Sequence, residues 1–440
     1  MAYALIAGLP PIYGLYAALT PQIVYAFLGT SRQLAVGPVA MDSLLVASGL
    51  GALSLVSPDQ YIQKAILLAL LMGLIQLLLG LFRMGFIVAF LSKPVISGFT
   101  SAAAIIIGLS QLKHLLGITI PQSNKLYIVV ESIFKNNSQI HFPTLAIGFS
   151  GIILLLIIKK WGRRIPASLV IVGLGIGWVY FTKQSEKGVA VVGLIPEGLP
   201  FFSVPDFEWE KIQVLFSTAL TLALVAFMEA ISVAKAIEEK HKNYEVNPNQ
   251  ELIALGASNI IGSLFQSYPT TGGFSRTAVN DQAGAKSGIA PLITASIIAV
   301  VLSFFTHWFF YLPKAILASI IIVAVANLIN INYAIRLYKT AKDEFLVLLF
   351  TFLLTLFIGI TEGILLGILL SLLLLVYRNS KPHFAFLGRI GTTNYFKNIH
   401  RFPDEVTSRE DLVILRFDAQ LLFGNFQYFK QLVNEAISKN

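Results

Sequence analysis

The 440-residue chain is far more apolar than a water-soluble protein of its length. Apolar residues make up 56% of it and charged residues 12%, with a mean hydropathy of +0.75, whereas a soluble domain carries about 25% charged residues. This composition argues against a soluble globular fold and predicts a membrane protein. The net charge of +9 indicates basic cytoplasmic loops rather than a nucleic-acid-binding surface.

Uncharged runs of sequence predict a series of membrane helices, since a helix needs about 20 apolar residues to cross the hydrocarbon core. The run before Pro10-Pro11 is too short, so we expect a first helix that lacks its upstream part. The expected spans are residues 1–9 (incomplete), 13–29, 38–51 (short), 60–82, 84–114 (broken at Pro94), 143–159, 166–182, 212–235, 249–265, 274–284 (short), 288–306, 314–334, 345–361 and 363–378.

The charged loops predict an orientation by the positive-inside rule. If the chain enters from the cytoplasm, one acidic loop (Asp206, Glu208 and Glu210) falls outside. Three basic clusters then fall inside: Lys159, Lys160, Arg163 and Arg164; Lys235, Lys240 and Lys242; and Arg336, Lys339 and Lys342.

The sequence becomes more polar after Arg378. Asp411–Asp418 is predicted to form a buried strand and Gly424–Ser438 an amphipathic helix. We therefore expect a transmembrane domain over residues 1–378 and part of a small soluble α/β domain over residues 379–440.

An extended, Gly- and Pro-containing segment precedes each of the two short predicted helices. One segment runs to Gly37-Pro38 and the other covers Ser267–Arg276, near the beginnings of two comparable halves, roughly 1–182 and 212–378. Paired short spans of this kind indicate a transporter site between inverted repeats. Helix N-termini have unpaired N–H groups and partial positive charge, so two facing ends could hold an anion. The alternative is a pair of ordinary loops.

Ionisable residues inside predicted spans are costly and usually mark function. We predict that Arg276 supplies positive charge to the anion and that Ser275 donates hydrogen bonds. The alternative is an arginine that reaches the interface or pairs with Asp42. Glu229 follows seventeen uncharged residues and could carry a coupling proton or cation, or merely hydrogen-bond a neighbouring helix. The helix dipole is a sufficient explanation for Asp42.

Several separated motifs occur in a recognisable order. They are Pro10–Tyr16, Gly29–Arg32, Val36–Ala40, Asn249–Leu252, Ser267–Ala278 and Asn280–Lys286. Together they resemble the sulfate permease (SulP) family of anion transporters over essentially the whole chain. The resemblance implies an all-α polytopic membrane fold, built as a seven-plus-seven inverted repeat with core and gate domains. It also implies a C-terminal cytoplasmic STAS domain, of which residues 379–440 would be the start.

The resemblance places the anion between the N-termini of the third and tenth helices, which begin here near Pro38 and Ser275. The implied ion-coupling residue is Glu229. The implied substrate-binding residues are Tyr3 of the first helix, Val39, Ala40, Ser275 and Arg276. An elevator motion and a homodimer are also implied. The chain departs from the family in lacking the polar residue that would stand just before Met1.

We therefore predict a secondary transporter of small anions, sulfate first, coupled to H⁺ or Na⁺ or working by exchange, in a bacterial cytoplasmic membrane. Membrane lipids are its expected surroundings, and no cofactor is expected. The alternatives are a bicarbonate or dicarboxylate transporter, an anion channel or a motor protein; the basic residue argues against a nucleobase permease. An enzyme is disfavoured because no catalytic motif is present and the histidines are scattered: His114, His141, His241, His307, His383 and His400.

Overall fold

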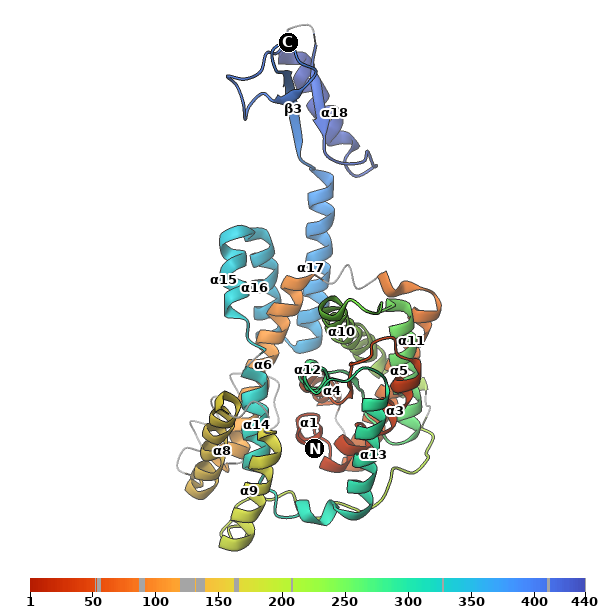
Figure 1. Ribbon diagram of the computed structural model, residues 1–440, viewed down its shortest axis with the longest axis vertical. Coiled ribbons are helices and arrows are strands. Elements are labelled where there is room, and N and C mark those ends of the chain that lie inside the picture. The colour runs from red at the N-terminus through yellow and green to blue at the C-terminus, as the bar shows by residue number, and fades with distance from the viewer. Residues whose placement is uncertain are drawn as a thin grey trace. The chain divides into compact units, whose positions relative to one another are not determined.

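The computed structural model describes residues 1–51, 53, 57–86, 92–118, 131, 139–161, 166–206, 209–326, 328–409 and 412–439. The chain divides into two compact units, Met1–Ile368 and Leu369–Asn440. The first unit is built almost entirely of helices (Figure 1).

The helices follow one another along the chain with short connections. They are α1 (Ala2–Ile6), α2 (Pro11–Tyr16), α3 (Thr20–Leu28), α4 (Ala40–Gly51), α5 (Pro58–Leu81), α6 (Lys93–Leu116), α8 (Phe142–Trp161), α9 (Ala167–Thr182), α10 (Trp209–His241), α11 (Pro248–Leu264), α12 (Phe274–Gln282), α13 (Ile289–Phe304), η3 (Thr306–Phe309), α14 (Lys314–Ala326), α15 (Ile331–Thr340), α16 (Lys342–Phe357) and α17 (Ile360–Ser380).

Within the described residues, six stretches are long and apolar enough to cross a membrane, and α4, α9 and α13 are shorter apolar helices. The six are Pro58–Leu81, Lys93–Leu116, Phe142–Lys160, Ile212–His241, Lys314–Thr340 and Glu362–Ser380. The predicted all-α polytopic membrane fold is confirmed.

Three predicted spans differ in detail, each for a local reason. The span 13–29 is two helices, and Pro21 stands in the first turn of the second, α3. Pro94 does not break a helix but occupies the first turn of α6, a position that suits proline. The span 314–334 ends early, because the Asn330 side chain caps a new helix, α15, by accepting a hydrogen bond from the backbone N of Tyr333 at 3.0 Å.

The helices of the first unit form two groups. In one group α3, α5, α10 and α11 pack together with α4, and in the other α6, α8, α9, α14 and α16 pack together. Glycines allow close helix approach in the first group: a Cβ added at Gly73 of α5 would lie 2.8 Å from the carbonyl oxygen of Gly256 in α11. Small residues at such crossings are typical of membrane helices.

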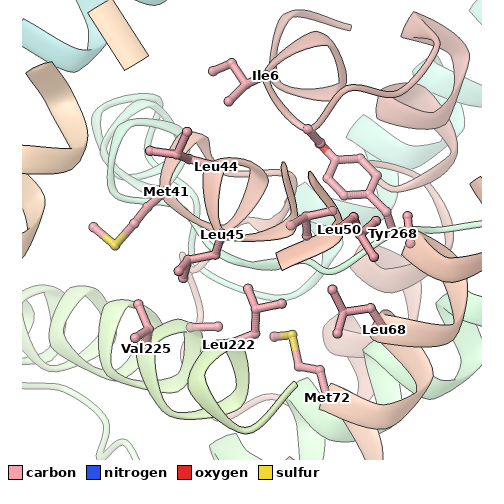
Figure 2. Packing of buried hydrophobic residues seen from close by; sticks show 14 of the residues in the cluster. Ile6, Met41, Leu44, Leu45, Leu50, Leu68, Met72, Leu222, Val225 and Tyr268 are labelled. Carbon is pink, nitrogen blue, oxygen red and sulfur yellow. The ribbon is translucent and has the colours of Figure 1, made fainter. Parts of the chain in front are cut away.

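The main apolar cluster lies where α4 meets α5 and α10. Figure 2 shows Met41 and Leu45 of α4 beside Leu222 and Val225 of α10, with Met72 of α5 below them. Leu45 and Met72 are fully buried. This packing fixes the short helix α4 against the long helix α10.

The second unit holds a small antiparallel sheet and one helix. Strands β3 (Phe384–Arg389), β4 (Phe396–Asn398) and β5 (Ile414–Phe417) lie in the order β4-β3-β5, and α18 covers Phe426–Lys439. The helix and β5 lie where they were predicted, but β3 and β4 were not anticipated. β5 is only half-buried, so the predicted burial is wrong, because its uninterrupted apolar run is matched by a single helix. Asp411 lies outside the described residues, and the predicted boundary after residue 378 falls in the last turn of α17.

Candidate functional site

A two-stranded ribbon brings the starts of the two short helices together. Strand β1 (Val36–Gly37) pairs antiparallel with β2 (Thr271–Gly272), so that Val36 lies opposite Gly272 and Gly37 opposite Thr271. Helix α4 begins directly after the first strand's Pro38-Val39 extension, and α12 begins directly after Gly273. The two helices lie beside each other in Figure 1. The pairing also satisfies backbone groups that lipid could not.

Hydrogen bonds lock α12 to the segment before α4. Gly273 N donates to Ala35 O at 3.1 Å. Ala35 N in turn donates to Thr277 Oγ1 at 3.1 Å, and the Thr277 hydroxyl donates to Gly273 O at 2.8 Å. Because Thr277 belongs to the first turns of α12, the two helix starts behave as one assembly.

Buried polar side chains hold β2 against α10 and α11. The amide of Asn259 accepts from Thr270 N at 2.9 Å and donates to Thr270 O at 2.9 Å. The Thr271 hydroxyl donates to Ala226 O at 2.6 Å. Asn259, Thr270 and Thr271 are fully buried, so these bonds replace the water that an extended backbone would otherwise need.

Glu251 organises the loop before β1. Its carboxylate is fully buried and accepts from Tyr25 OH at 2.7 Å, from Thr30 N at 2.7 Å, from Thr30 Oγ1 at 2.6 Å and from Ser31 N at 3.2 Å. Hydrogen bonds to an ionised acceptor are among the strong ones. Sequence reasoning gave Glu251 no role, although an acid in the first turn of an apolar helix was the available signal.

The predicted residues of the two helix starts lie near one another. The Val39 side chain approaches the α12 start: a Cβ added at Gly273 would be 3.2 Å from Val39 Cγ2. Ala40 is buried as the first residue of α4, and Ser275 is exposed as the second residue of α12. Both helices begin slightly away from the predicted positions, since Pro38 precedes α4 instead of opening it.

Arg276 of α12 reaches across the ribbon to Gly37. A Cβ added at Gly37 would overlap Nη1 of Arg276 and lie 3.0 Å from its Cζ, so only glycine leaves room there. Nη1 is buried and, within the described part of the chain, has no hydrogen-bond partner. Neither carboxyl oxygen of Asp42 has a partner there either, so the alternative in which Arg276 pairs with Asp42 is wrong.

Tyr3 of α1 is half-buried and packs against the main apolar cluster. Its hydroxyl lies within electrostatic range of Arg276 and Glu229. The structure therefore brings the predicted side chains from α1, α10 and α12 into one neighbourhood.

A cavity of about 630 Å³ lies between the two helix groups. Met41, Glu229 and Phe274 line it on the side of α4, α10 and α12, and Lys93 and Asn330 line it opposite them. Oε2 of Glu229 is buried there without a hydrogen-bond partner among the described residues. Val39 and Ser275 are not in the lining; the cavity reaches the helix starts through Met41 and Phe274.

Comparisons with characterised sequences agree on one family. The sequence profile of the sulfate permease family matches residues 1–351. The chain is 41% identical over 441 residues to "Sulfate transporter 4.1, chloroplastic" of Arabidopsis thaliana, covering 99% of this chain and 64% of that protein. It is 35% identical to "Sulfate transporter 3.2" of the same plant, covering 100% and 70%. The chain thus spans about two thirds of the length of these relatives.

Solved structures give the same result for the fold. The structure of SLC26A9 superposes with a TM-score of 0.91 at 27% identity, covering 99% of this chain and 71% of that one. The transmembrane domain of the cyanobacterial bicarbonate transporter BicA superposes with a TM-score of 0.73 at 22% identity, covering 84% and 92%; at that identity the likeness concerns the fold alone. From the profile match and the identity to its relatives, we conclude that the chain belongs to the sulfate permease family.

Proposed function

We propose that this protein is a secondary active transporter of small inorganic anions, with sulfate as its main substrate. The observation that carries the proposal is the joined pair of helix starts, α4 and α12, with the unpartnered Nη1 of Arg276 beside them. The names of the relatives support the same substrate class, because both plant relatives are called sulfate transporters.

The charge of the site suits a divalent oxyanion. Each helix N-terminus carries roughly half a positive charge, and Arg276 adds one more, which sums to roughly two positive charges. Sulfate carries two negative charges, so it would be neutralised without any further cation. Tyr3, Val39, Ala40 and Ser275 would surround the anion, with backbone N–H groups as its main donors.

The proposed mechanism is an elevator in which the group containing α4, α10 and α12 slides against the group containing α6 and α14. The cavity between the two groups is the proposed path from the cytoplasm to the site. Glu229, which lines it, is the proposed coupling residue for H⁺ or Na⁺. We further propose that two copies associate in a bacterial cytoplasmic membrane and that residues 379–440 belong to a STAS domain.

Reconstitution tests the proposal directly. The purified protein in liposomes should accumulate radiolabelled sulfate when a pH or sodium gradient is imposed, and unlabelled sulfate should compete better than bicarbonate or a dicarboxylate. Stronger competition by one of those anions would reassign the substrate. Uptake that only equilibrates sulfate, whatever gradient is imposed, would indicate a channel and contradict coupled transport.

A further inference from the structure

Asp42 is a buried acid that the proposed anion site does not use. It stands in the first turn of α4 with no solvent exposure. Neither of its carboxyl oxygens has a hydrogen-bond partner among the described residues. An acid that stabilises a helix N-terminus through its dipole usually accepts a hydrogen bond from a backbone N–H. The helix dipole is therefore an insufficient explanation for Asp42.

The packing of α4 on α10 brings a second acid close to Asp42. Val225 of α10 lies against the start of α4 (Figure 2), and Glu229 follows Val225 by one helical turn. The Glu229 carboxyl interacts electrostatically with Asp42, and its Oε2 is also buried without a partner. Two like charges without hydrogen bonds are costly in such a place, and a shared proton relieves that cost.

The other groups around Asp42 do not supply a counter-ion in contact with it. Arg276 of α12 interacts with the hydroxyls of Tyr3 and Tyr268, and Tyr268 OH forms a hydrogen bond with Ser43 Oγ at 3.1 Å. The remaining helices in contact with α4 are α5 and α6. Their ionisable side chains all retain some exposure: Asp59, Tyr61, Lys64, Lys93, Lys113 and His114.

We propose that Asp42 and Glu229 form a two-carboxyl proton site, which takes up protons when the anion binds next to Arg276. This inference deepens the proposed function by naming the proton as the coupling ion and Asp42 as its second carrier. With both acids ionised, Arg276 leaves the three side chains at a net charge of minus one, which repels an anion. With both protonated, the net charge is plus one, which attracts it.

The charge change makes anion affinity depend on pH. By linkage, each proton taken up with the anion lowers the affinity about tenfold per pH unit, once the pH exceeds the range in which the free site holds that proton. A site with two titrating carboxyls therefore gives a steeper decline than a site with one. Asp42→Asn removes one of them and keeps the shape of the side chain.

The experiment measures sulfate affinity and proton uptake together on the purified protein between about pH 5 and pH 9. We expect the wild-type protein to take up protons from a weakly buffered dye solution when sulfate is added. Asp42→Asn should take up fewer and lose affinity less steeply at high pH. Asp59→Asn, at an exposed acid in the first turn of α5, is the matched control and should behave as wild type. Equal proton uptake by wild type and Asp42→Asn would overturn the proposal.

A second measurement is independent of anion binding. Infrared spectra of the wild-type protein should contain a protonated-carboxyl band that loses intensity in Asp42→Asn and in Glu229→Gln. Identical spectra in wild type and Asp42→Asn would refute the proton site. If the wild-type protein bound none of the tested anions while the infrared difference was present, the proposed transport function would fail and the proton site would stand.

Discussion

Gly37→Ala is the sharpest test of the proposed anion site, because it disturbs Arg276 without touching it chemically. The added Cβ would overlap Nη1 of Arg276, lie 3.0 Å from Cζ and 3.3 Å from Nη2. Ordinary carbon contacts need about 3.5–4.0 Å, so the guanidinium must move by at least about 0.5 Å.

The expected magnitude follows from that overlap. Adding a methyl group to a close-packed site typically costs about 1–3 kcal/mol, which corresponds to a loss of roughly 5- to 150-fold in sulfate affinity if the displaced Arg276 bears the cost. Gly108→Ala is the matched control. A Cβ at Gly108 in α6 meets nothing within 4 Å, so that variant should bind as wild type and be stabilised by up to about 1 kcal/mol.

The assay is sulfate binding by calorimetry, with thermal unfolding as the check on folding. Arg276→Gln provides a second background, since it removes the guanidinium that the methyl group meets. Gly37→Ala should change affinity less in that background than in the wild type. Wild-type affinity in a folded Gly37→Ala protein, or an equal effect in both backgrounds, would refute a role for Arg276 in binding.

Three further substitutions have separate expected outcomes. Arg276→Gln should lower sulfate uptake into liposomes at least about tenfold, while Arg276→Lys keeps the charge and should retain part of the uptake; normal uptake by folded Arg276→Gln would exclude this residue. Glu229→Gln should flatten the pH dependence of uptake, and an unchanged pH profile would rule out coupling through Glu229. Glu251→Ala should lower the free energy of unfolding by about 1–3 kcal/mol because it orphans the buried Tyr25 hydroxyl. Adding Tyr25→Phe to that variant should then cost little, and full additivity in thermal unfolding would contradict the contact.

Much of the architecture was predictable from hydrophobicity alone. Uncharged runs located the long helices, because a helix is the conformation that satisfies its own backbone in lipid. The boundaries that failed are those set by single residues. Pro94 starts a helix instead of breaking one, and Asn330 caps α15 and so divides a predicted span.

The pair of short helices was also predictable, since each follows a Gly- and Pro-containing segment. Their adjacency depends on the register between β1 and β2, in which Gly37 lies opposite Thr271 across more than half of the chain. A sequence reveals that two segments are extended, but their hydrogen-bond partners are chosen by tertiary packing.

The sequence by itself determined the solvent of this protein, the places of its helices and the residue types at its proposed site. Only the tertiary structure decided which polar groups meet. Arg276 lies over Gly37 and not against Asp42, and Glu251 binds the loop before β1. The physical reason is that an isolated buried charge is too costly in a membrane, so each one depends on the neighbours that folding brings to it.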